Sequence, residues 1–222
     1  MAQMLRVAVF VAFAAICLLV IWRWQINGWG SFVWLSSAIL MTVIRAPYAE
    51  QNKSNTISGQ YAVSTERVLL ALVAIGGTVL PLAHLTTGAF AFANYPLPKW
   101  APLIGIALQA PGFWLFWRSH ADLGRNWSVT TELREDHSLT TTGVYSRIRH
   151  PMYSAIWLIF TSYPFLIHNW IAGLAALLTF GLMYFIRVPI EEGMMRDQFG
   201  EAYTAYCART GRLLPKLKSK VQ

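Results

Sequence analysis

The segment "GVYSRIRHPMYSA" (residues 143–155) places ionisable and aromatic side chains where a polar stretch meets a long apolar run. Arg147 requires no special role, because basic residues commonly anchor the cytoplasmic end of a membrane helix. An anchor requires charge alone, however, and not the imidazole of His150 or the phenol of Tyr153. An arginine such as Arg149 can donate two hydrogen bonds to a carboxylate, and a tyrosine face attracts a cation. The segment therefore indicates a functional site at the membrane boundary.

Two adjacent acids, Glu191 and Glu192, follow the last apolar run of the chain. Each has an arginine four residues away, Arg187 and Arg196, and this spacing commonly forms ion pairs on exposed helices. Here the acids lie at the membrane end of a predicted helical hairpin, and ionisable groups at that depth are often functional. We therefore favour a functional role for the two acids.

Three other histidines give no indication of a metal site. His84 lies in an apolar helix, where a single imidazole is usually a packed, hydrogen-bonded group. His120 and His137 lie near several acids, but no HxxxH or HxxE spacing joins them. Cys17 and Cys207 have no Cys or His at ligand spacing, so we predict neither a metal nor a disulfide framework.

The composition is that of an integral membrane protein. Of 222 residues, 55% are hydrophobic and only 13% are charged, whereas an ordinary soluble domain has about 25% charged residues. The chain contains 10 Trp and 9 Tyr, which concentrate at membrane–water boundaries. The net charge of +8 lacks the basic run and soluble core expected of a nucleic-acid-binding protein. No glycine-rich nucleotide loop, GxSxG or zinc-protease pattern is present.

A helix needs about 20 mostly apolar residues to span a bilayer, and six segments qualify as candidates. They are residues 4–23, 30–45, 67–88, 100–118, 152–167 and 170–187. The last two are close enough in sequence to form a tight antiparallel hairpin. Residues 191–209 should continue as a cytoplasmic amphipathic helix, because apolar residues recur every three or four positions. That stripe consists of Met195, Phe199, Tyr203 and Tyr206. The predicted fold class is therefore all-α and polytopic.

Basic residues are distributed unequally between the two sides that six spans would create. If both termini share one side, that side holds all of the 18 lysines and arginines except Arg23 and Lys99. The positive-inside rule then predicts cytoplasmic termini. The polar segment 119–150 and the tail from Arg187 lie on the same side, so we expect the active site at the cytoplasmic face.

Four sequence blocks, in order, resemble the isoprenylcysteine carboxyl methyltransferase family, to which membrane phospholipid methyltransferases are related. They are "LGRNWS" (123–128), "LTTTGVYSRIRHPMY" (139–153), the paired acids, and "FGEAYTAYCARTGRLLP" (199–215). The resemblance covers residues 115–216. It implies a membrane enzyme that transfers a methyl group from S-adenosylmethionine to a lipophilic acceptor, leaving S-adenosylhomocysteine. It also divides the chain into N-terminal transmembrane helices over 1–114 and a catalytic core over 115–222.

The resemblance implies a cofactor pocket formed by the last hairpin and the C-terminal segment, without a Rossmann sheet or a metal. The catalytic residues would be Arg187, Glu192 and Tyr153. The cofactor-binding residues would be Tyr145, Arg149, His150, Pro151, Tyr153, Glu191, Glu192, Tyr203, Tyr206 and Arg212. In this assignment Arg149 suits the cofactor carboxylate, Glu192 its amine or ribose hydroxyls, and Tyr153 its sulfonium.

The acceptor is left open by the sequence. Eukaryotic carboxyl methyltransferases show "GxNFNH" where this chain has "GRNWSV" (124–129). A carboxylate is already nucleophilic, and Arg187 or Arg118 could orient it. An amine would need a base such as Glu192 or His150, as in a phospholipid amine N-methyltransferase. A less favoured alternative is an NADPH-dependent, sterol-reductase-like enzyme, which would call for a longer chain. The expected partners are the bilayer and a lipid or prenylated small-molecule acceptor.

Overall fold

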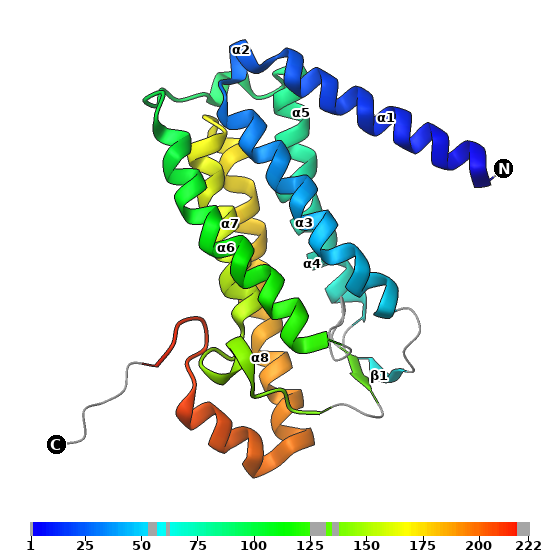
Figure 1. The fold of residues 1–222 in the computed structure, drawn as a ribbon, viewed down its shortest axis with the longest axis vertical. Coiled ribbons are helices and arrows are strands. Elements are labelled where there is room, and N and C mark those ends of the chain that lie inside the picture. Colours follow the sequence, from blue (N-terminus) through cyan, green and yellow to red (C-terminus); the bar gives the residue numbers. More distant parts are fainter. Residues whose placement is uncertain (1, 53–56, 61–62, 125–131, 135–137, 217–222) are drawn as a thin grey trace.

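The computed structural model describes residues 2–52, 57–60, 63–124, 132–134 and 138–216. Long helices pack side by side into a bundle, and α1 extends away from it toward the N-terminus (Figure 1). The helices are α1 (Ala2–Trp22), α2 (Trp24–Asn27), α3 (Gly30–Asn52), α4 (Val63–Ala74), α5 (Leu80–Thr87), α6 (Ala101–Leu123), α7 (Pro151–Leu166) and α8 (Trp170–Arg209). A short antiparallel ribbon pairs β1 (Ile57–Gln60) with β2 (Glu132–Arg134). The all-α class is confirmed, with this ribbon as a small addition.

Among the described residues, three helical runs are long and apolar enough to cross a membrane: Gly30–Gln51, Thr65–Thr87 and Trp170–Arg209. The second of these joins α4 to α5 through a π-helical turn, Ile75–Val79. The span count of six stays a prediction. Three predicted boundaries were too short. The second predicted helix continues past residue 45 to Asn52, and the fourth continues past residue 118 to Leu123. Helix α8 runs through the acids without a break.

The main packing contact of the bundle is between α6 and α7, and small residues on α6 make it close. A Cβ at Gly105 would lie 2.5 Å from a methyl of Leu166, so any larger residue would force the buried Leu166 side chain to shift. A buried polar link ties α3 to the pair. Ser37 Oγ donates to Gln109 Oε1 at 2.6 Å, and Gln109 Nε2 donates to Ser162 Oγ at 2.8 Å. Small residues and satisfied polar groups commonly join membrane helices in this way.

The predicted hairpin is present between α7 and α8, and Asn169 builds its turn. The Asn169 side-chain oxygen accepts hydrogen bonds from the backbone N–H groups of Ile171 and Ala172 at 3.1 and 2.9 Å. This is an N-cap, which satisfies two otherwise unpaired donors at the start of α8. The Asn169 amide nitrogen donates to Asn94 Oδ1 at 2.8 Å, so the turn is also joined to the loop before α6.

The far end of α8 turns back toward the start of α7. Gly200 has φ 50° and ψ −123° inside the helical run, a left-handed conformation that glycine adopts readily. The kink directs the remaining turns of α8 across the end of the bundle (Figure 1). The chain beyond Arg209 is thereby brought against the segment that contains Arg149.

Candidate active site

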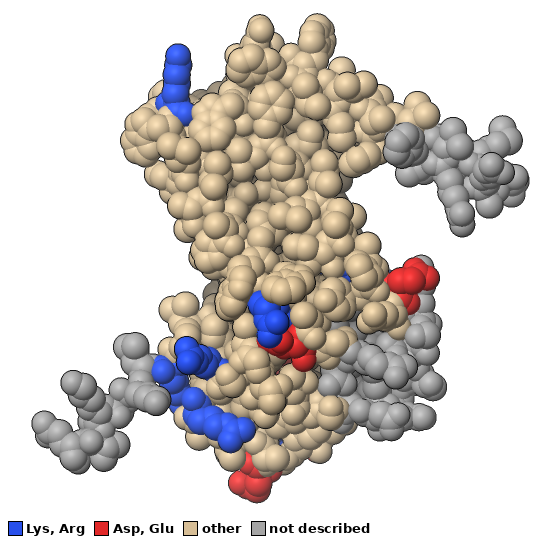
Figure 2. All heavy atoms as spheres, in the orientation of Figure 1, with Lys and Arg blue, Asp and Glu red and all other residues tan. Residues whose placement is uncertain are grey.

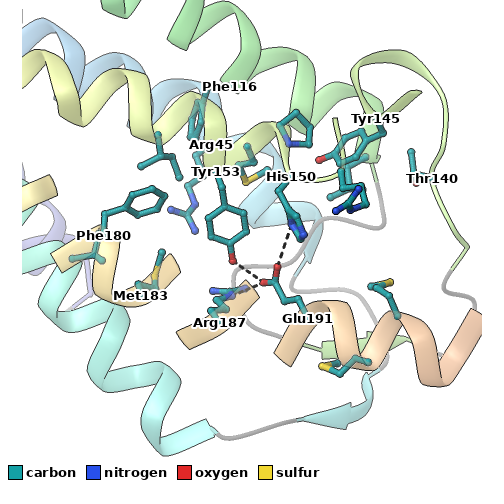
Figure 3. Close-up of a pocket in the computed structure, with 18 of the residues that line it drawn as sticks. Arg45, Phe116, Thr140, Tyr145, His150, Tyr153, Phe180, Met183, Arg187 and Glu191 are labelled. Carbon is teal, nitrogen blue, oxygen red and sulfur yellow. Dashed lines mark hydrogen bonds and ion pairs between the residues drawn. The ribbon is translucent and has the colours of Figure 1, made fainter. Parts of the chain in front are cut away.

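A cavity of 280 Å³ lies between α3, α4, α6, α7 and α8, at the end of the bundle where α8 turns back. Its volume is near the lower limit of ordinary small-molecule sites, roughly 300–1,000 Å³. Figure 3 shows Tyr153 and Glu191 near the middle of the cavity, which has an apolar part and a part that holds more polar side chains. Phe180 and Met183 lie on one side of this pair, and Tyr145 and Thr140 lie on the other.

The apolar part is built largely from helices of both halves of the chain. Its walls are formed by Met41, Leu70, Val73, Phe116, Met152, Ile156, Phe160, Phe180 and Met183. Arg45 also lines the cavity, and Figure 3 shows it beside Tyr153. An apolar chamber with one arginine is suited to a lipophilic molecule that carries an anionic group.

The start of α7 is fixed by short backbone pairing with the C-terminal segment. Arg149 N–H donates to the Gly211 carbonyl at 2.8 Å, and His150 N–H donates to the Arg212 carbonyl at 3.0 Å. The Ser154 hydroxyl adds a 2.6 Å hydrogen bond to the Leu213 carbonyl. The C-terminal block therefore pairs with the "RHP" segment, and its closure over a cofactor stays a prediction.

Glu192 is the ionic centre behind this part of the wall. Its carboxylate is 2% exposed and lies 2.7 Å from Arg212 Nη2, 3.3 Å from Arg149 Nε and 3.3 Å from His150 Nε2. Arg196 Nη2 is 3.5 Å away. A buried carboxylate is tolerated when cations and hydrogen bonds surround it. Glu192 and Arg212 support the wall from behind, and direct contact with a cofactor stays a prediction for both.

A second ionic chain runs through Glu191. The Tyr153 hydroxyl donates to Glu191 Oε1 at 2.8 Å, and Arg187 Nε donates to the same oxygen at 2.6 Å. Arg187 Nη1 also lies 3.0 Å from Glu66 Oε1, on α4. The side chains of Arg187 and Glu191 are only 12% and 20% exposed. This i,i+4 pair therefore belongs to a buried network rather than to an ordinary solvated helix face.

Three tyrosines of the predicted site lie together at the polar end. Tyr145, Tyr203 and Tyr206 all line the cavity, and the Tyr206 hydroxyl donates to the Tyr145 carbonyl at 2.6 Å. Burial raises the pKa of the Tyr145 phenol above its ordinary value, with a smaller contribution from Tyr206. The phenol thus stays neutral at physiological pH and donates to the Ser119 carbonyl at 3.3 Å.

Nine of the predicted site residues share the lining of this one cavity. They are Tyr145, Arg149, His150, Pro151, Tyr153, Arg187, Glu191, Tyr203 and Tyr206. Arg118 instead forms a 2.6 Å ion pair with Asp122 and does not line it. Residues 125–128 of the predicted "LGRNWS" block lie outside the described residues. Within the described ranges, no group of three metal-ligating side chains occurs.

Sequence reasoning missed Arg45 and Glu66. Arg45 ends an apolar run, where a basic residue looks like any positive anchor. Glu66 precedes another such run, and nothing in its local spacing connects it to Arg187. The available signal for Glu66 was a carboxylate at the very start of a membrane-length helix.

The fold and the cavity define a polytopic, all-α membrane protein with a polar chamber joined to an apolar one. The phospholipid methyltransferase (PEMT) family profile matches residues 100–202. Protein-S-isoprenylcysteine O-methyltransferase B of Arabidopsis thaliana is 32% identical over 96 residues, which cover 41% of this chain and 48% of that protein. A probable protein-S-isoprenylcysteine O-methyltransferase of Oryza sativa subsp. indica is 26% identical over 190 residues, covering 82% and 95%.

Among solved structures, the eukaryotic intramembrane Ras methyltransferase ICMT matches with a TM-score of 0.50 and 19% identity. That match covers 83% of this chain and 63% of the solved one, so the chain spans about two thirds of it, and about half of the Arabidopsis relative. The structural match shows the shared fold. Taken with the sequence relatives, it shows that this chain is similar to proteins of the isoprenylcysteine carboxyl methyltransferase family.

Proposed function

We propose that this protein is an S-adenosylmethionine-dependent methyltransferase that methylates the carboxylate of a lipophilic, prenylcysteine-like acceptor. The observation that carries the proposal is the single cavity with two chambers. One chamber is polar and borders the charged C-terminal block, and the other is apolar and lies among membrane helices. Such a cavity lets a water-soluble donor and a membrane-dissolved acceptor meet at one place.

The side chains around the polar chamber fit S-adenosylmethionine. Tyrosine rings suit a sulfonium cation and a flat base, and Tyr145, Tyr203 and Tyr206 supply them. Glu191 offers a carboxylate for the amine or the ribose hydroxyls, and Arg149 offers a guanidinium for the carboxylate. When bound, S-adenosylmethionine supplies an electrophilic methyl group. The protein contributes positioning and exclusion of water, which are what an in-line displacement requires.

The arrangement of arginines favours a carboxylate acceptor over an amine. Arg187 pairs with the carboxylates of Glu66 and Glu191 and holds Tyr153 and Glu191 in place. Arg45 lines the apolar part of the cavity beside Tyr153, where an acceptor headgroup would lie. Arg45 attracts a carboxylate there and repels an ammonium group. Because of this position, we assign the orientation of the acceptor to Arg45; Arg118 does not line the cavity.

A phospholipid amine N-methyltransferase is the second candidate, because the matched family profile carries the name phospholipid methyltransferase. That reaction would need a base beside the amine. His150 is the best placed, since it lines the cavity and its Nδ1 lies 3.8 Å from Glu191 Oε2.

A transfer assay separates the two candidates. Purified protein in nanodiscs is given methyl-labelled S-adenosylmethionine with N-acetyl-S-farnesylcysteine, its amide, or phosphatidylethanolamine. We expect label only in the free acid, in a form that mild base releases as methanol, as a methyl ester requires. Label in phosphatidylethanolamine, with none in the farnesylated acid, would replace the O-methylation proposal by N-methylation.

We further propose that both termini and the active site face the cytoplasm. This rests on the distribution of charge. Figure 2 shows charged side chains gathered over the half of the molecule that holds the turned-back end of α8, while the opposite half is almost free of them. Arg147 is exposed, so it can be replaced by cysteine for labelling. In intact cells this cysteine should not react with a membrane-impermeant maleimide, and it should react once the membrane is permeabilised. Labelling from the outside of intact cells would reverse the assignment.

A further inference from the structure

A second cavity, of 330 Å³, lies at the opposite end of the bundle from the candidate active site. The active site adjoins the Pro151 end of α7, and this cavity adjoins the turn at Ile167 and His168, beyond its other end. Its walls come from the turn between α2 and α3, the end of α5 and the loop that leads into α6. Nothing in the proposed methyl transfer uses it.

The cavity contains a buried imidazole nitrogen that the protein does not satisfy. His84 lines the cavity and is 6% exposed, and its Nδ1 has no hydrogen-bond partner among the described residues. The buried Nε of Arg23, a residue that does not line the cavity, is also unpaired among the described residues. Arg23 lies against the end of α5, because its Nη2 is 3.1 Å from the place that a Cβ on Gly88 would take. It is close enough to His84 for electrostatic interaction. Unpaired buried polar groups cost free energy, so the unpaired His84 nitrogen in the cavity wall indicates a missing ligand.

The electrostatic surroundings select an anion as that ligand. The segments that form this end, residues 23–30, 88–100 and 167–170, contain no Asp or Glu. They contain Arg23 and Lys99, and Lys99 lines the rim of the cavity. A cation would meet positive charge without compensation, whereas an anion would be attracted by each of these groups.

Hydrogen bonds between the wall segments hold the cavity open before any ligand binds. Asn27 Nδ2 donates to the Leu85 carbonyl at 2.8 Å, which joins the α2–α3 turn to α5. Trp29 Nε1 donates to the Lys99 carbonyl at 2.8 Å, which joins the same turn to the start of α6. A site whose walls are already fixed loses little entropy when a ligand binds.

Exposed aromatic rings place the cavity at the level of lipid headgroups. Trp24, Trp100 and Trp170 are 45%, 58% and 57% exposed around this end of the bundle. Exposed tryptophans gathered at one end of a membrane protein mark the boundary between hydrocarbon and water. The phosphate groups of a bilayer lie at the same depth, within reach of the rim.

We propose that this cavity binds a phosphate group at the membrane face opposite the active site, through His84 and Lys99 with Arg23 behind them. The phosphate is carried by a lipid headgroup or is a free ion, and both sources present the same chemistry. A phosphate bound at His84 and Lys99, with the positive charge of Arg23 behind it, would also draw the end of α1 toward the start of α6. The bound phosphate would thus fasten α1, which extends away from the bundle, to the rest of the protein (Figure 1).

Native mass spectrometry of the full chain, stripped of lipid in an uncharged detergent, tests the proposal. The probes are phosphatidylglycerol, diacylglycerol with the same acyl chains, and inorganic phosphate. The variants are Lys99→Gln, Arg23→Gln/Lys99→Gln, and the charge-matched control Arg147→Gln at the other end. We expect phosphatidylglycerol to bind in preference to diacylglycerol. Because the Lys99 contact and the nearby positive charge of Arg23 are both lost, the double variant should bind it at least about tenfold more weakly.

Each result has a defined meaning. Displacement of phosphatidylglycerol by millimolar inorganic phosphate would identify the free ion as a ligand, and resistance to displacement would identify the lipid. Equal binding of diacylglycerol, or an equal loss in Arg147→Gln, would overturn the proposal. Lys99 is exposed, so Lys99→Gln folds normally and must show a partial loss if the site exists. Unchanged affinity for S-adenosylhomocysteine in all variants would show that the active site is intact, which keeps this test independent of the proposed function.

Discussion

Replacing Glu192 by Gln should both destabilise the protein and weaken cofactor binding. The carboxylate is 2% exposed and touches the side chains of Arg149 and His150, which are 12% and 11% exposed. Removing one partner of a buried ion pair costs about 3–5 kcal/mol, and since Gln keeps one acceptor oxygen we expect about 3 kcal/mol. For a chain of 222 residues, a change of that size lowers Tm by roughly 6–12 °C.

The control for this prediction is Arg196→Gln, which removes another partner of the same carboxylate. Arg196 is 54% exposed and its Nη2 lies 3.5 Å from Glu192 Oε2. Exposed ion pairs contribute about 0–1 kcal/mol, so this variant should melt within a few degrees of the wild type. Thermal unfolding and calorimetric titration with S-adenosylhomocysteine measure both effects. If Glu192→Gln melted like Arg196→Gln and bound the ligand normally, the ionic centre would not hold the wall of the pocket.

Three further predictions concern the acceptor, the reaction and the packing. Arg45→Gln should raise KM for the carboxylate acceptor at least about tenfold, and an equal loss of S-adenosylhomocysteine affinity would contradict its assignment to the acceptor. Tyr153→Phe removes the 2.8 Å hydrogen bond to Glu191 but keeps the aromatic ring. We therefore expect kcat to fall while the affinity for the cofactor stays within about twofold of the wild type. An unchanged kcat would refute the role of the Tyr153 hydroxyl in the reaction. Gly105→Ala should cost about 1–3 kcal/mol by overpacking, whereas Gly193→Ala, with open space around it, should be neutral or slightly stabilising by thermal unfolding.

The helical hairpin could be predicted because its determinants are local. Two apolar runs separated by a very short polar link leave no other arrangement than antiparallel neighbours. The sequence did not predict that α8 continues without a break past residue 187. Arg187, Glu191 and Glu192 interrupt the apolar pattern, but their side chains pack into ionic networks, so the helix continues past them. The bend comes later, at Gly200.

The site was predictable where its residues belong to motifs and unpredictable where tertiary packing supplies a partner. The "RHPMY" segment and the paired acids meet across the cavity as expected. Glu66 and Arg45 come from α4 and α3, and a charge at the end of a membrane helix carries the same sequence signal whether it anchors the helix or lines a cavity. The distinction between Glu191 on the cavity surface and Glu192 behind it depends on helix rotation, which adjacent letters in a sequence do not reveal.

The most direct test of the account is the affinity of the purified protein for S-adenosylhomocysteine, measured by calorimetry for the wild type and for Arg149→Gln. We predict saturable binding to the wild type and an affinity at least about tenfold lower for the variant, because Arg149 lines the cavity and is hydrogen-bonded to Glu192 and to the C-terminal block. Binding of NADPH without any binding of S-adenosylhomocysteine would overturn the proposed methyltransferase function.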